Sequence, residues 1–267
     1  SFVGSGANLT GIDAGFTPDS QENLYAGSDA GQQSDADTCF NIALGYEAGK
    51  YLNEGDLNVF LGCEAGKCVQ SGGCNIAIGA QAGKCITSGL YNTSIGFKAG
   101  ALTSNSTGRC NVFIGSYNGN KITTGCNNIG IGDYTLQGNT TGKWNISIGL
   151  YAGSSCADTK GRNISVGRCT NFRTYGEKNI AIGENAGQGT APSSTGDNTG
   201  TDNIFLGTDS GRCITTGNWN VFLGKSSGNK LTAGTDNILL GQKSGCSLTT
   251  HTNNVLIGPY AGIFNNG

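Results

Sequence analysis

Apolar residues alternate with other residues in short segments that recur about every 17 residues along the chain. In the segment 75–83, for example, Asn75 is followed by Ile76 and Ile78, and Gly79 comes next. Side chains two residues apart on an extended segment point to the same side. Each segment therefore predicts a short strand that ends at its glycine. We expect the first and third strand residues, such as Ile76 and Ile78, to face the interior.

The asparagine that precedes each strand recurs at intervals of 16 to 19 residues, with one interval of 24. After Asn23 it stands at Asn41, Asn58, Asn75, Asn92, Asn111, Asn128, Asn145, Asn163, Asn179, Asn203, Asn220, Asn237 and Asn254. A repeat of this kind predicts coils stacked about 4.8 Å apart. In such a stack the asparagines would form a column of hydrogen-bonded amides. The alternative is that each asparagine adopts a left-handed turn before its strand; neither role is catalytic.

Two further positions complete the repeat. A small residue such as Ala48 lies seven residues after the asparagine, and an apolar one such as Leu52 lies eleven after it. We expect a second short strand there and a narrow interior. The predicted fold is all-β, a single elongated β-solenoid or β-roll of about fourteen 17-residue coils, on the order of 65–70 Å long. Residues 1–267 form one repeat domain, with an irregular first coil 1–22, regular coils 23–187, an insertion 188–199 and regular coils 200–267.

The middle residue of each strand is predicted to face outward and is often large and apolar. The candidate interface residues are Phe60, Phe113, Phe205, Phe222, Leu239 and Leu256. Outward phenylalanine and leucine predict that another chain covers this face, and hence a homo-oligomer. The alternative is a flattened coil in which the strand is buried on both faces.

Composition excludes several classes of protein. With 47 glycines in 267 residues the repeats cannot be helical, and a net charge of −2 gives no basic surface for nucleic acid. The chain has no run of 18 apolar residues, the length that would predict a membrane-spanning helix. A single histidine and the absence of Cys-x-x-Cys spacing argue against a metal site. We expect no catalytic residues, no cofactor and no enzyme activity.

The eleven cysteines and several glycosylation sequons bear on whether the protein is extracellular. Cys68 and Cys85 hold the same position in consecutive coils, so they are the candidate disulfide; the alternative is that cysteines act as small apolar fillers. Asn8, Asn105 and Asn139 are candidate glycosylation sites at corners of the coils. Disulfides would agree with an extracellular protein.

The string Asn-[Ile/Val]-x-[Ile/Leu]-Gly-x-x-Ala-Gly, found at 75–83, 145–153 and 179–187, resembles Gly-rich repeats in tail-fibre and virion-appendage proteins of marine bacteriophages. Their cysteine-containing form is similar to residues 82–89. The Ile-x-Ile-Gly core is also similar to the head repeats of trimeric autotransporter adhesins, which form parallel β-rolls that assemble as trimers. The resemblance implies a fibrous, trimeric protein on the outside of a virion or a cell.

These observations predict a structural fibre or appendage subunit at an extracellular or virion surface that contributes to reach and attachment. Its expected partners are further copies of itself, which could also stack end to end, and surface glycans. One alternative is a carbohydrate-binding adhesive module, with stacking platforms at Trp144, Trp219, Tyr91, Tyr117 and Tyr151. A minor alternative is an ice-binding solenoid that uses the threonine pairs near one corner.

Overall fold

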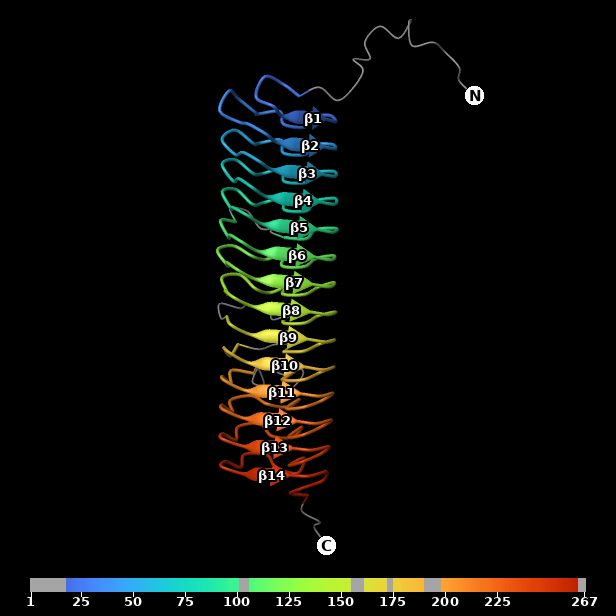
Figure 1. The fold of residues 1–267 in the computed structure, drawn as a ribbon, viewed down its shortest axis with the longest axis vertical. Helices are drawn as coiled ribbons and strands as arrows, with labels where there is room; N and C mark the ends of the chain where they lie inside the picture. The colour runs from blue at the N-terminus through green and yellow to red at the C-terminus, as the bar shows by residue number, and fades with distance from the viewer. Residues whose placement is uncertain (1–17, 101–105, 155–160, 172–174, 190–197, 264–267) are drawn as a thin grey trace, which may run out of the picture.

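The computed structural model describes residues 18–100, 106–154, 161–171, 175–189 and 198–263. These residues form a rod of stacked coils in which all strands lie in one row (Figure 1). The predicted β-solenoid is confirmed, and no described residue lies in a helix. Accordingly, no described segment is a helix that would be long and apolar enough to cross a membrane.

Each coil contributes one strand of three residues to a single parallel sheet, in the order of the sequence. The strands are β1 Leu24–Ala26, β2 Ile42–Leu44, β3 Val59–Leu61, β4 Ile76–Ile78, β5 Thr93–Ile95, β6 Val112–Ile114, β7 Ile129–Ile131, β8 Ile146–Ile148, β9 Ile164–Val166, β10 Ile180–Ile182, β11 Ile204–Leu206, β12 Val221–Leu223, β13 Ile238–Leu240 and β14 Val255–Ile257. Equivalent residues of neighbouring coils are paired, as Val59 is with Ile76. Thirteen steps of about 4.8 Å make the sheet about 60 Å long.

The asparagines form the predicted column, which we call the asparagine ladder. The side-chain Oδ1 of Asn41 accepts hydrogen bonds from the backbone N–H of Asn58 at 2.8 Å and from its Nδ2 at 3.0 Å. Nδ2 of Asn58 also donates to the carbonyl oxygen of Gly72 at 2.8 Å. The bond from backbone N–H to Oδ1 recurs at every step from Asn23 to Asn254, at 2.8–3.1 Å.

Both functions of the amide are therefore needed, because its oxygen accepts and its nitrogen donates. The left-handed turn of the alternative interpretation belongs to the preceding residue, for example Leu57 at φ 58° and Cys74 at φ 56°.

The prediction of which strand residues face inward is wrong. Middle residues are buried, with 0% exposure at Phe60, Phe205, Phe222 and Leu239 and 1% at Phe113, while Leu256 in the last strand is half-buried. These candidate interface residues are instead core residues packed inside the coil. The physical reason is strand alternation: the buried asparagine lies two residues before the middle residue, so both point inward.

In the coils that the structure describes in full, three positions besides the ladder asparagine fill the interior. Besides the middle strand residue, these are the small residue seven positions after the asparagine, such as Ala65, and the apolar residue eleven after it, such as Val69. Both were predicted to face inward. The second strand was not correctly predicted, since the described residues at this corner form no strand and only isolated bridges, such as the one between Ile86 and Ser106. Backbone hydrogen bonds still join the coils at this corner, as from Gln70 N–H to the Thr87 carbonyl at 2.9 Å.

Two apolar cores share the length of the rod. One extends from Ala43 to Leu136 and the other from Ala181 to Leu248. Between them the interior is polar, with Ser147, Ser165 and Asn171 around a cavity of about 10 Å³. Asn171 Nδ2 donates to Ser165 Oγ at 2.8 Å. Stability is therefore divided along the rod into two apolar blocks joined by a polar one.

The glycine that ends each strand supports close stacking of the coils, which gives a first prediction. Gly79 has φ 124°, and a Cβ there would lie 2.7 Å from the carbonyl oxygen of Gly96 in the next coil. We expect Gly79→Ala to lower the free energy of unfolding by about 3 kcal/mol, through backbone strain and this clash. Urea unfolding followed by circular dichroism measures it.

Gly258 is the matched control, because it has φ 118° but nothing within 4 Å of its Cβ position. Gly258→Ala should lower the free energy of unfolding only through backbone strain. Equal losses in the two variants would therefore contradict a role of Gly79 in stacking.

Candidate interaction surface

The outer face of the sheet is a continuous apolar surface, formed by the first and third residues of all strands. Of these 28 residues, two from each of fourteen strands, only Thr93 is polar. Many remain exposed despite being apolar, for example Ile76 at 38%, Ile131 at 39% and Leu223 at 46%. With a length of about 60 Å and a width of about 10 Å, this face covers about 600 Å². That is the upper end of what the largest apolar patch on a monomer usually covers.

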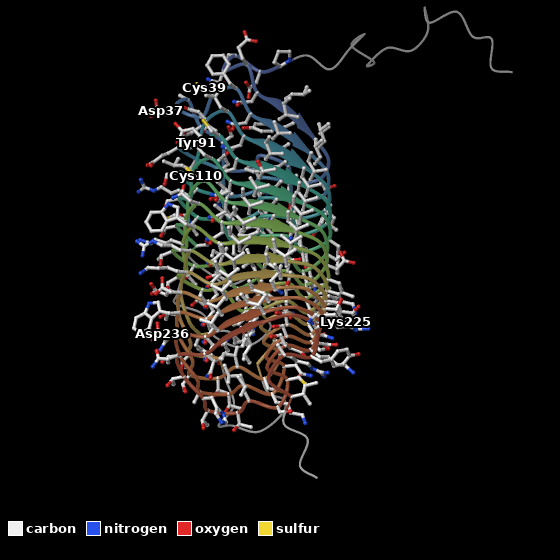
Figure 2. The ribbon with its side chains drawn as sticks, turned by 60° about the horizontal axis from the view of Figure 1, so that its bottom comes forward. Asp37, Cys39, Tyr91, Cys110, Lys225 and Asp236 are labelled. Carbon is white, nitrogen blue, oxygen red and sulfur yellow. The ribbon has the colours of Figure 1, made fainter. Side chains whose placement is uncertain are left out.

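Two columns of side chains border this face. The residues directly before the ladder asparagines form one column, the asparagine edge. The residues directly after the strand-ending glycines form the other, the glycine edge. Figure 2 shows Tyr91, Cys110 and Asp236 of the asparagine edge on one side of the rod, and Lys225 of the glycine edge on the opposite side.

The composition of both edges changes along the rod in the same way. Beside β2 to β5 the asparagine edge consists of Phe40, Leu57, Cys74 and Tyr91, and the glycine edge of Tyr46, Cys63, Ala80 and Phe97. Five of these are strongly exposed apolar residues, from 44% at Phe97 to 60% at Tyr91. Beside β9 to β13 the edges instead carry charges, among them Lys178 and Asp202 on one and Glu184 and Lys225 on the other. The apolar surface is therefore widest in the N-terminal half.

A ladder of ion pairs follows the corner beyond the glycine edge. Its members are, in order, Asp29, Lys50, Glu47, Lys67, Glu64 and Lys84. Lys67 contacts both Glu47 and Glu64, and Glu64 lies 2.8 Å from Lys84. Sequence reasoning missed this network, because the carboxylates were assigned to the solvated surface. The available signal was glutamate at one position and lysine three residues later in consecutive coils.

The ion pairs predict a loss of stability in acid. Hydrogen bonds from Lys84 and Lys67 lower the pKa of Glu64 to about 2 from 4.5. Because the pKa is depressed in the folded state, this stabilisation is present above about pH 4.5 and is lost as the pH falls toward 2. We expect Glu64→Gln to be less stable by up to about 1 kcal/mol at pH 7, and to lose less stability than the wild type between pH 4.5 and 2. Urea midpoints across this range test it, and parallel curves would contradict it.

Aromatic rings stack along the same corner further down the rod. Tyr117 and Tyr134 are stacked with centroids 5.2 Å apart, and Tyr134 and Tyr151 with centroids 5.0 Å apart. Phe97 meets Tyr117 edge-on at 5.4 Å. Since these rings cover one another's faces, Tyr117 and Tyr151 offer little free face for a sugar. Of the five proposed platforms, the structure places Tyr91, Trp144 and Trp219 on the asparagine edge, with exposures of 60%, 51% and 59%.

A small pocket lies beside Trp144. It has a volume of about 200 Å³ and is lined by Thr141, Lys143, Trp144, Gly161, Arg162 and Glu177. The Arg162 guanidinium lies 5.3 Å from the Trp144 ring centroid and 3.9 Å from the Glu177 carboxylate. One aromatic ring with cationic and anionic groups around it provides both a stacking surface and hydrogen-bonding partners.

Cys68 and Cys85 lie side by side, as their shared position predicts, but the structure does not join them by a disulfide. Stacking brings them into hydrogen-bonding contact without a covalent bond. The hydrogen bond from Cys85 lowers the pKa of the Cys68 thiol to about 6, and Lys84 and Lys67 contribute electrostatically.

The candidate glycosylation sites have different outcomes. Asn139 is fully buried, and its Oδ1 accepts a hydrogen bond from the Gly142 N–H at 2.8 Å. Its prediction as a glycan site is therefore wrong, since a glycan needs an exposed amide. Asn8 and Asn105 lie outside the described residues, as does most of the insertion 188–199.

Threonine hydroxyls at one corner are engaged in the stack. Thr123, Thr215 and Thr232 donate to backbone carbonyl oxygens of the next coil at 3.0, 2.9 and 3.1 Å. This use of the hydroxyls counts against the ice-binding alternative. Within the described ranges, no group of three or more His, Cys, Asp or Glu side chains is placed to hold a metal ion.

Comparisons with family models, with curated proteins and with solved structures give no match to this chain.

Proposed function

We propose that the chain is a structural subunit of a fibre or appendage on the outside of a virion or a cell, where it provides reach and contributes to attachment. The observation that carries this proposal is the asparagine ladder, which joins every coil from β1 to β14 by the same hydrogen bond. A backbone held at constant spacing over about 60 Å gives a stiff rod. The long faces of such a rod present columns of side chains at fixed height.

The proposal is tested by locating the protein. Antibodies against the purified chain, applied as immunogold to intact producing cells or particles, should label their outer surface, and negative-stain micrographs of the purified protein should show rods. Label found only after the cells or particles are opened would overturn the proposal. Unrelated cells or particles treated with the same antibody provide the background.

A second function, glycan binding at the Trp144 pocket, is favoured by the exposed ring and the charged groups beside it. If a sugar stacks on Trp144, Trp144→Ala should weaken binding to a glycan array by at least about fivefold, since one aromatic contact contributes about 1 kcal/mol or more. Trp219→Ala is the matched control, because Trp219 lies on the same edge and is similarly exposed. Equal binding by wild type and Trp144→Ala would contradict the role of this pocket.

A further inference from the structure

The outer face of the sheet requires a partner of its own length. Its apolar side chains extend along all fourteen strands with a single polar interruption. A typical stable interface buries about 800 Å² on each partner. The face alone supplies about 600 Å², and the apolar edge residues beside β2 to β5 extend it further. The area is therefore sufficient for a specific interface.

The repeat identifies the partner. A surface with ridges about 4.8 Å apart over about 60 Å is matched along its whole length only by another surface of the same period and straightness. Figure 1 shows the strands in a nearly straight stack. A second copy of this chain has the same period, because its coils are identical. We propose that the outer face of the sheet is the interface with further copies of this chain, packed parallel and in register; this rests on the proposed function as a fibre subunit.

The two edges indicate the parallel orientation. Rotation about an axis along the rod keeps each residue at its height and brings the asparagine edge of one copy against the glycine edge of the next. At the height of β5, Tyr91 would then meet Phe97, and at β10 Lys178 would meet Glu184. At β12, Trp219 would meet Lys225, a cation–π combination. Apolar residues thus face each other at β5, and opposite charges face each other at β10.

The antiparallel orientation gives a poorer match. It reverses the heights and brings the asparagine edges of two copies together. Cys74 would then face Asp202 and Phe40 would face Asp236. Tyr91 would meet Lys178 as a cation–π combination, and Leu57 would meet Trp219, so the mismatches lie at β2 and β4. Burying an apolar edge against these charges removes their solvent; Lys178 and Asp202 keep each other as ion-pair partners at 3.9 Å, whereas Asp236 would face only Phe40. In the parallel arrangement the like charges at β9, Arg162 and Arg168, each have their own carboxylate, Glu177 and Glu184.

The first experiment measures assembly. Analytical ultracentrifugation of the intact protein at micromolar concentration should give the mass of two or more chains. Ile129→Lys with Ile131→Lys, at the centre of the face, should raise the dissociation constant by more than about 100-fold, because the lysines would be buried without partners. Thr124→Lys, at an exposed position outside the face, should leave assembly unchanged. Circular dichroism establishes that each variant retains its fold.

The second experiment measures orientation. In a background with Cys63, Cys74 and Cys110 changed to serine, Tyr91→Cys with Phe97→Cys should form intermolecular disulfides on mild oxidation. Each single change should not, because its partner edge lacks a thiol at that height. Tyr91→Cys with Lys178→Cys is the antiparallel control, and cross-linking of this pair alone would overturn the proposed orientation.

A monomer at micromolar concentration would overturn this inference, as would unchanged assembly of the lysine variant. A monomeric rod that still labels the outer surface would leave the fibre proposal standing. Conversely, if the protein assembled but was found only inside the cells or particles, the fibre proposal would be overturned and the proposed interface would stand.

Discussion

Asn58→Asp is expected to destabilise the rod more than any other single change of similar size. Asn58 is fully buried, and its Nδ2 donates to Asn41 Oδ1 at 3.0 Å and to the Gly72 carbonyl at 2.8 Å. An aspartate would place an acceptor, charged at neutral pH, against two other acceptors. We expect the free energy of unfolding to fall by about 4 kcal/mol or more at pH 7, because a buried charge and two unsatisfied groups result.

The pH dependence distinguishes this mechanism from a simple loss of packing. Burial beside acceptors raises the pKa of the new carboxyl group in the folded state. The difference in stability between wild type and variant should therefore shrink as the pH falls below that raised pKa, since the protonated acid is neutral and regains one donor. Urea unfolding at pH 7 and pH 5, at one protein concentration, measures both effects.

Asn53→Asp is the matched control, because Asn53 is only partly buried, on the preceding coil. It should change the free energy of unfolding by less than about 0.5 kcal/mol. A loss in Asn58→Asp that is as small, or one that is the same at both pH values, would contradict the role assigned to the amide.

The repeat and its asparagine column could be derived from the sequence because both are periodic. Constant spacing predicts stacked coils, and stacking places equivalent asparagines next to one another. It was harder to predict which strand residues face inward, because the outward residues are as apolar as the inward ones. Ile76 and Ile78 look like core residues by type alone. Yet a buried Asn75 already requires Ala77 to be buried, since the two lie two residues apart.

Size complementarity was a second available signal for the core. Phe60 lies between Ala43 and Ala77 in the neighbouring coils, so a large ring has small residues on both sides. In this part of the rod the interior accommodates a phenylalanine beside small residues, whereas in β11 to β13 the large residues Phe205, Phe222 and Leu239 are direct neighbours. A column that alternates in this way is typical of a packed interior.

The surface features were less predictable because they arise between coils. The contact between Lys67 and Glu47 crosses from one coil to the next, and the stacked rings of Tyr117 and Tyr134 do so as well. These contacts depend on which side chains share a column and on how each corner turns. The residues at this corner are themselves left-handed, and side chains as different as Glu64 and Tyr117 stand there. The residue types therefore did not predict this left-handed conformation.

Phe222→Ala should separate the two possible orientations of the strand. Phe222 has no exposed surface, and its ring lies 5.4 Å from that of Phe205 in the previous coil. A ring this close to Gly228, where a Cβ would lie 2.6 Å from it, fills the interior from one wall to the other. Its removal leaves a cavity that cannot collapse, because the asparagine ladder fixes the strand position. We expect the free energy of unfolding to fall by about 3 to 5 kcal/mol.

The measurement should also be local. In a stacked repeat each coil contacts only its neighbours, and Phe222 belongs to the second apolar core. Hydrogen exchange should therefore accelerate in residues 198–263 and remain unchanged in residues 18–100. Phe97→Ala is the matched control, because Phe97 is 44% exposed, and it should cost less than about 1 kcal/mol. If Phe222→Ala instead weakened association between chains and left the stability of each chain intact, the middle strand residues would have to face outward.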